Sequence, residues 1–137
     1  MTTDVGRQAA LVHTVTDDDT ALAAGSGDVP VLATPRLLAL FEAATVAALA
    51  EGGLDPQLTS VGTRVLLEHL LPSPVGETVT VTARLAAVDG RQLAFECVAT
   101  DDADRVLGRA EVSRVVVSRA QFLDRPSRAQ PSAPERA

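Results

Sequence analysis

Glu42 is the residue whose position in this sequence most needs an explanation. Almost every side chain from Leu37 to Ala50 is aliphatic or aromatic, and Glu42 lies in the middle of that stretch. An ionised carboxylate in apolar surroundings costs several kcal/mol unless it is paired, or else its pKa rises and it stays neutral. Two interpretations remain open. Glu42 is a functional group, or it emerges at the helix surface or binds an arginine across an interface.

His69 is the second candidate. Counting by twos along a predicted strand at 63–71, His69 is in phase with Val65 and Leu67, so its ring is expected on an apolar face. A single histidine on an apolar face is more often a satisfied core residue than a catalyst. The other histidine, His13, has nothing acidic in phase beside it, and we expect it to be structural or at the surface.

Thr34 and Gly62 carry weaker signals. Thr34 precedes Pro35, which makes it a good N-cap for the helix that follows, and this ordinary role is enough to explain it. A helix N-terminus also carries free N–H groups and the positive end of the helix dipole, where a developing oxyanion can be stabilised. Gly62 can present a backbone N–H to a ligand without side-chain hindrance. Neither signal is specific.

The hydrophobic pattern predicts the elements that position these residues. We expect a short strand over 9–16, an acidic turn at 17–19 and a loop at 23–31. A helix then runs from the Thr34 cap to about Glu51, where two glycines end it. Further strands are expected over 63–71, 77–88, 91–102 and 105–119. Asp89-Gly90 is a hairpin signal between two of them.

These elements indicate an α+β domain in which an antiparallel sheet, three or four of its strands a meander, wraps around one long central helix. The helix needs burial on all sides, and one small curved sheet covers it incompletely. A second subunit would cover the rest. The expected domain spans 9–123, after a flexible N-terminus at 1–8 and before a disordered tail at 124–137, which is mostly Pro, Ser, Arg and Ala.

Composition argues against several classes of protein. The net charge of −6 argues against nucleic-acid binding, which needs a basic face. One cysteine, Cys97, excludes an intramolecular disulfide and a cysteine-rich metal site, and two histidines need further ligands to hold zinc. The start of the chain lacks a signal-peptide pattern, and no apolar run reaches the roughly 20 residues of a membrane span. We therefore expect a cytoplasmic protein with no metal, cofactor, nucleic-acid or membrane partner.

Three segments together resemble a known family. They are "VLATPRLLALFEAA" at 31–44, "VGTRVLLEHLLPSPVGETVTVTARLAAVDGRQLAFECVATDD" at 61–102 and "SRVVVSRAQFL" at 113–123. The pattern is similar to the hot-dog-fold thioesterases related to fluoroacetyl-CoA thioesterase, over roughly 10–123. Its most specific parts are the Thr-to-Glu spacing on the helix and the Gly-Thr strand that ends in His and is followed by Pro-x-Pro-x-Gly.

The resemblance implies a hot-dog fold, a homodimer with the active site near the interface, and hydrolysis of an acyl-CoA substrate. It implies a catalytic set of Thr34, Glu42 and His69, with Gly62 contributing a backbone N–H near the acyl group. Glu42 would attack the thioester carbonyl as a nucleophile or act as a general base. His69 would orient Glu42 or relay a proton, and Thr34 would hydrogen-bond the set or the substrate.

The sequence also departs from these relatives. Of the Gly-x-His-x-Arg that they often show in the last strand, only Arg114 is kept, either as a structural residue or as a substrate-binding contact to a CoA phosphate. Arg36 and Arg64 are further candidates for that contact, from charge alone. The segment 25–30, "GSGDVP", lacks the aromatic lid of fluoroacetyl-CoA thioesterase, so fluoroacetyl selectivity is not expected. A pocket of Leu, Val and Ala favours a small or medium apolar acyl group.

Other functions compete with thioester hydrolysis. A non-catalytic acyl-CoA binding module would keep the same fold and pocket. A hot-dog hydratase ranks last because the Asp and His expected together on the helix are absent, and a purely structural dimer leaves Glu42 and His69 unexplained together. Geometry also constrains the catalytic set. In a regular helix Thr34 and Glu42 lie about 12 Å apart along the axis, so His69 can bridge them only if the chain at Thr34 has not yet entered the helix.

Overall fold

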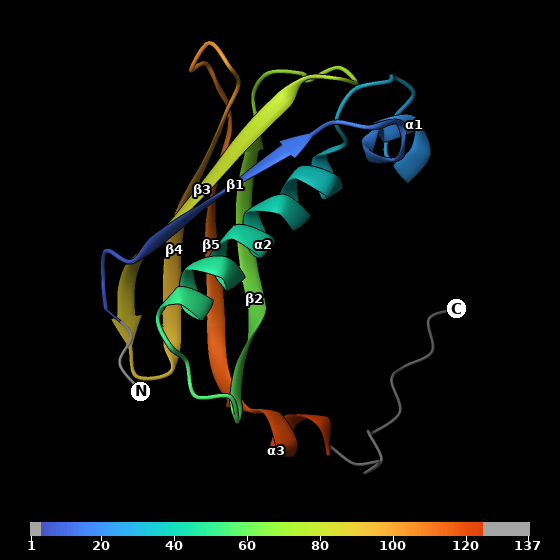
Figure 1. The fold of residues 1–137 in the computed structure, drawn as a ribbon. Helices are drawn as coiled ribbons and strands as arrows, with labels where there is room; N and C mark the ends of the chain where they lie inside the picture. The colour runs from blue at the N-terminus through green and yellow to red at the C-terminus, as the bar shows by residue number, and fades with distance from the viewer. Residues whose placement is uncertain (1–3, 125–137) are drawn as a thin grey trace.

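Residues 4–124 are described by the structure, a computed structural model, and they form one antiparallel sheet with a long helix lying across one face (Figure 1). The strands are β1 (Gln8–Thr14), β2 (Leu58–His69), β3 (Thr78–Asp89), β4 (Gln92–Thr100) and β5 (Val106–Ser118). The long helix is α2 (Thr34–Glu51). A 3-10 turn, η1 (Asp17–Asp19), and a short helix, α1 (Ala21–Ala24), separate β1 from α2, and α3 (Arg119–Leu123) follows β5.

The strand order is β1-β3-β4-β5-β2. Strands β3, β4 and β5 form the predicted meander, which has three members because β2 pairs with β5 and not with β3. The predicted hairpin turn lies between β3 and β4, where Gly90 has a φ of 62°. Strands β1 and β2 are therefore the two edges of the sheet, and β2 runs beside α2 on one side of the molecule (Figure 1).

A β-bulge divides β2 into two halves. Gly62 pairs with Arg114 and Arg64 pairs with Ser113, so Thr63 is an extra residue in the strand. Such an insertion resets which side chains face which side of the sheet. As a result Gly62 and His69 both face α2, although they lie an odd number of positions, seven, apart in the sequence.

The core lies between the sheet and α2. Alternate residues of β3 from Val79 to Leu85 are fully buried, as the alternating pattern predicts. Leu37, Phe41 and Ala44 of α2 are also fully buried, at the spacing that puts one helix face against a sheet. The opposite face is left open. Val46, 48% exposed, lies there, so one sheet does cover the helix incompletely.

The predicted helix is confirmed, and it ends at Glu51 as expected, but its N-cap is Ala33 and not Thr34. Ala33 has an extended backbone, with φ −74° and ψ 144°. Its amide donates to the carbonyl of Asp19 at 2.8 Å, and this tie keeps Ala33 out of the helix. Thr34 is consequently the first helical residue, so the condition that would let His69 bridge Thr34 and Glu42 is not met.

Two other boundaries differ from the sequence prediction. β2 begins at Leu58, ahead of the predicted 63, because its pairing with β5 extends to Ser118. β1 begins at Gln8, one residue before the predicted domain boundary at 9. Backbone hydrogen bonds from Gly6 to Leu85 and from Leu85 to Arg7, both at 2.8 Å, attach the residues just before it to β3. Of the predicted tail, residues 125–137 lie outside the described part of the chain. Helix α1 was not predicted.

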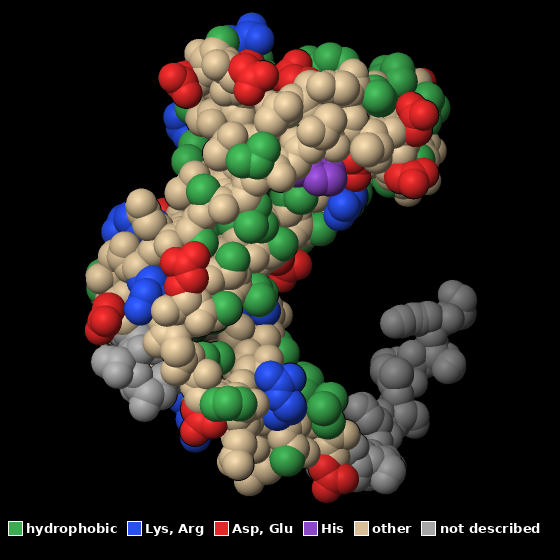
Figure 2. Space-filling view, in the orientation of Figure 1, with side chains coloured by type: hydrophobic (Ala, Val, Ile, Leu, Met, Phe, Trp, Pro, Cys, Tyr) green, Lys and Arg blue, Asp and Glu red, His purple; other side chains and the backbone are tan. Residues whose placement is uncertain are grey.

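The face beside α2 is hollowed. Figure 2 shows a concave side of the molecule between α1 and α3, with hydrophobic side chains along it. No helix within residues 4–124 is long and apolar enough to cross a membrane.

Replacing Phe95 tests the position of the core. Phe95 is 1% exposed, and we expect Phe95→Ala to lower the free energy of unfolding by about 3–5 kcal/mol because it leaves a cavity. Urea unfolding at one fixed protein concentration measures the change. Phe122→Ala is the matched control, since Phe122 is 44% exposed. Equal losses from the two variants would contradict this description of the core.

Candidate active site

The N-terminus of α2 and the end of β2 meet in a polar pair. Thr34 Oγ1 and His69 Nδ1 are 2.8 Å apart. The backbone holds the two residues together, because the amide of Leu32 donates to the carbonyl of Ser73 at 2.8 Å. A β-bridge between Val31 and Pro74 reinforces this tie. The chain just before Thr34 is thus fastened to the chain just after His69.

The other ring nitrogen of His69 is left unsatisfied within residues 4–124. His69 Nε2 is buried and has no hydrogen-bond partner among the described residues. Burial lowers the pKa of His69, so the neutral imidazole is favoured. In a neutral ring one nitrogen donates and the other accepts. The Thr34 hydroxyl can satisfy Nδ1 in either tautomer, which leaves Nε2 as the atom that can serve a bound molecule.

A cavity of about 310 Å³ surrounds this pair. Thr34 and His69 lie in its wall, and most of the remaining lining is aliphatic, including Val29, Leu70 and Leu71. No charged side chain contributes to the lining. The site therefore combines one hydrogen-bonded polar pair with an apolar space, as small-molecule sites commonly do.

Glu42 lies in a second cluster, about two turns further along α2. Its carboxylate is packed so closely against Gly62 that a Cβ at position 62 would collide with Oε2. Arg114 Nη1 of β5 lies 3.6 Å from the same oxygen. The Glu42 side chain is 36% exposed, so it is only half buried in this chain. Its neutralising partner comes from the same chain and not from across an interface.

Arg114 is held rigidly beside Glu42. Its Nε donates to Ser60 Oγ at 2.8 Å and its Nη2 donates to the Ser60 carbonyl at 3.0 Å. Nη1 donates to Thr45 Oγ1 at 3.4 Å, and the Thr45 hydroxyl donates to the Glu42 carbonyl at 2.6 Å. Burial lowers the pKa of Arg114 and the Glu42 charge raises it, while a guanidinium stays charged in proteins. These contacts fit the structural alternative for Arg114, and its contact to a CoA phosphate stays a prediction.

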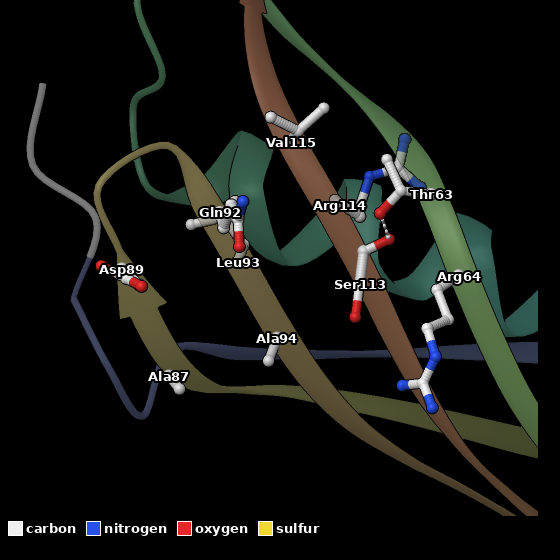
Figure 3. A pocket seen from close by; sticks show the side chains of 10 residues that line it. All are labelled: Thr63, Arg64, Ala87, Asp89, Gln92, Leu93, Ala94, Ser113, Arg114 and Val115. Carbon is white, nitrogen blue, oxygen red and sulfur yellow. Dashed lines mark hydrogen bonds between the residues drawn. The ribbon is translucent and has the colours of Figure 1, made fainter.

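A larger cavity, of about 580 Å³, lies on the opposite face of the sheet. Figure 3 views it with α2 behind the strands. Arg64 and Ser113 point towards the viewer, while the Arg114 side chain turns back towards the helix. Thr34, Glu42 and His69 do not line this cavity. The candidate site is therefore on the helix side of the sheet.

The structure brings the predicted residues together in two groups. Thr34 meets His69, and Glu42 meets Gly62 and Arg114. Within residues 4–124 no hydrogen bond or ion pair joins Glu42 to Thr34 or to His69. About 12 Å of helix separates the two groups, so one chain alone does not assemble the predicted catalytic set.

Sequence reasoning missed a third cluster, centred on Asp19. His13 Nε2 lies 2.8 Å from Asp19 Oδ2, and Arg36 Nε lies 2.7 Å from Oδ1. His13 thus has an acidic partner from outside its own strand, and this contact fits the structural role expected of it. The signal was the acidic turn at 17–19, but the sequence does not say which of its three carboxylates turns inward. Within residues 4–124 no group of three or more His, Cys, Asp or Glu side chains is placed to hold a metal ion.

Comparisons with known proteins identify relatives over most of the chain. The family model FlK, fluoroacetyl-CoA-specific thioesterase, matches residues 15–120. The fluoroacetyl-CoA thioesterase of Streptantibioticus cattleyicolor is 38% identical over 92 residues, which are 67% of this chain and 65% of that protein. The match thus spans slightly less than two thirds of that curated relative.

Solved structures agree with this assignment. A structure of the fluoroacetyl-CoA thioesterase FlK is 30% identical, with a TM-score of 0.84, and the match covers 96% of this chain and 100% of that one. A hot-dog-like protein from Thermanaerovibrio acidaminovorans is 26% identical, with a TM-score of 0.79, over 88% of each chain. Together with the five-stranded sheet and its single long helix, these matches confirm the predicted hot-dog fold.

The burial of His69 predicts a pH dependence. Because burial lowers its pKa from the ordinary 6.5, the folded protein binds fewer protons than the unfolded chain between the lowered value and 6.5. The free energy of unfolding should therefore fall as the pH drops through this window, and His69→Gln should reduce that slope. Histidine NMR measures the titration directly, with His13→Gln to assign the two signals. A His69 pKa at or above 6.5 would contradict the burial.

Proposed function

This chain belongs to the fluoroacetyl-CoA-specific thioesterase family, and from that membership we propose that it hydrolyses an acyl-CoA thioester to the free acid and CoA. The observation that carries the proposal is the Thr34–His69 pair in the wall of an uncharged, largely aliphatic cavity. Such a cavity suits an acyl group, and the pair can hydrogen-bond its thioester.

The proposed acyl group is small or medium in size and apolar. A charged acyl group would lose its hydration in this cavity without gaining an ion pair. Each methylene buried there contributes about 0.8 kcal/mol, or roughly fourfold in kcat/KM. Segment 25–30 carries no aromatic side chain over the cavity. We therefore propose no selectivity for fluoroacetyl-CoA, although relatives are named for that substrate.

Glu42 is the proposed base or nucleophile. As a base it takes a proton from water while the water oxygen bonds to the thioester carbon. As a nucleophile its own oxygen forms that bond, and water then hydrolyses the acyl-enzyme. In both routes the C–S bond breaks and the CoA thiolate leaves. In either route Arg114, whose Nη1 lies 3.6 Å from the Glu42 carboxylate, is the cation that faces it.

Donors for the developing oxyanion lie on two elements. In the first turn of α2 the N–H of Thr34 is the proposed donor, because Pro35 has no N–H and those of Arg36 and Leu37 donate to the Ala33 carbonyl. The N–H of Gly62 is the other proposed donor, as the family resemblance implies. Removing one such donor typically costs about 10²–10³ in kcat.

We further propose that the protein acts as a homodimer in which Glu42 of one protomer completes the Thr34–His69 site of its partner. Three features support this. The two groups are too far apart on one helix to act together, the face of α2 around Val46 is open, and β2 has a free edge. A second copy lying in the hollow beside α2 would cover all of them (Figure 2).

Release of free CoA tests the activity. Wild type should release CoA from short and medium straight-chain acyl-CoAs, more slowly from succinyl-CoA, and Glu42→Gln should lower kcat by about 10²–10⁴. Glu96→Gln is the matched control, because Glu96 pairs with Arg84 at the exposed surface, and it should retain activity. Saturable binding of acyl-CoA without any CoA release would instead favour a non-catalytic binding module.

Subunit complementation tests the shared site. Glu42→Gln and His69→Ala are each expected to be inactive alone. After the two are unfolded and refolded together, about half of the dimers are mixed and each has one intact site, so roughly a quarter of wild-type activity should return. Sites built from one chain would show no recovery. Light scattering on the same samples measures whether they are dimers.

A further inference from the structure

Asp19 has a buried carboxylate that joins three parts of the chain. Its side chain is 3% exposed. Oδ2 accepts from the Thr16 amide at 2.7 Å, from the Thr16 hydroxyl at 3.0 Å and from His13 Nε2 of β1 at 2.8 Å. Oδ1 accepts from Arg36 Nε, in the first turn of α2, at 2.7 Å. The carboxylate thus links η1, β1 and α2.

The backbone of Asp19 is attached to the same helix. Its carbonyl accepts from the Ala33 amide at 2.8 Å, and the neighbouring amide of Ala21 donates to the Val31 carbonyl at 2.8 Å. Thr34 lies between Ala33 and Arg36. Asp19 therefore holds the first turn of α2 on both sides of Thr34. Its carbonyl binds Ala33, just before Thr34, and its carboxylate binds Arg36, just after it.

The chemistry of this contact suits a positioning role better than a stabilising one. Burial raises the pKa of the Asp19 carboxyl, but hydrogen bonds from Thr16, His13 and Arg36 outweigh that effect and hold the pKa well below its ordinary range. A buried ion pair gains little over well-packed apolar side chains because desolvation offsets its attraction. It does impose a direction, since each donor must meet a fixed oxygen.

We propose that Asp19 is a positioning residue, which through Arg36 and Ala33 fixes the first turn of α2 so that the Thr34 hydroxyl meets His69 Nδ1. The catalytic part of this inference rests on the proposed function. The structural part, that Asp19 governs the Thr34–His69 contact, does not. The alternative is that Asp19 only closes the acidic turn at 17–19, with no effect beyond it.

Histidine NMR separates these alternatives without any substrate. The chain has two histidines, so an untagged protein with ¹⁵N-labelled histidine gives one set of ring signals for each. Asp19→Asn should shift His13, its direct partner, and also His69, which it does not touch. Arg36→Gln leaves the hydrogen bond between His13 and Asp19 in place, and it should also shift His69. Arg84→Gln, which removes the exposed pair with Glu96, is the control and should shift neither.

Unchanged His69 signals in a folded Asp19→Asn or Arg36→Gln variant would overturn the proposal. Arg36→Gln keeps the test available if Asp19→Asn fails to fold, because the Arg36 side chain is 42% exposed. Circular dichroism of each variant verifies that it is folded.

Kinetics tests the catalytic part. Asp19→Asn and Arg36→Gln should lower kcat about tenfold or more with little change in KM. A misplaced catalytic group slows the chemical step but does not weaken the binding of substrate. In a Thr34→Val background, Asp19→Asn should cost almost nothing further, since both act on one contact. Additive losses would overturn the positioning role.

A rise in KM alone for Arg36→Gln would assign Arg36 to substrate binding instead. If wild type releases no CoA, the proposed function fails, and the NMR result still decides the structural part.

Discussion

The position of residues 31–33 is the constraint on which the rest of this site depends. Backbone hydrogen bonds hold this short segment on both edges, to 19–21 on one side and to Ser73 and Pro74 on the other. The helix can begin only where these ties end, which is at Thr34. The same ties bring the chain that follows His69 into contact with the chain that precedes Thr34. Main-chain pairing thus brings the two side chains within reach of each other, whatever their own attraction.

A second consequence of the helix geometry is that the polar groups are separated. Thr34 and Glu42 are on one rigid helix, and each takes its partners from the part of β2 that it crosses. Glu42 is half exposed and lies 3.6 Å from a buried arginine that has three other contacts. This carboxylate has a fixed partner, but the Thr34–His69 site of its own chain lies about two helical turns away. The proposed homodimer would give it such a site nearby.

The sequence predicted the helix, the meander and the inward direction of His69, because each is encoded by a local period. It also predicted that Glu42 needs a partner, but Arg114 is distant in sequence and only the pairing of β2 with β5 brings it near. The N-cap was wrong because a tertiary hydrogen bond to Asp19 outweighed the cap preference of Thr34. Asp19 itself was missed because three adjacent aspartates look alike until the fold turns one of them inward. The likeness to known proteins supplied what local periods lack, namely the hot-dog fold that these elements form.

The bulge at Thr63 has a consequence for how this strand can change. Gly62 serves the Glu42 cluster and His69 serves the Thr34 cluster, and a regular strand would send them to opposite sides of the sheet. The two residues share an orientation because Thr63 is one extra residue in the strand, and this insertion returns His69 to the face that Gly62 occupies. Substitution of Thr63 leaves that count intact, whereas loss of one residue from 63–68 would turn one of the two clusters towards solvent. Along this stretch the number of residues therefore matters more to the site than their identity.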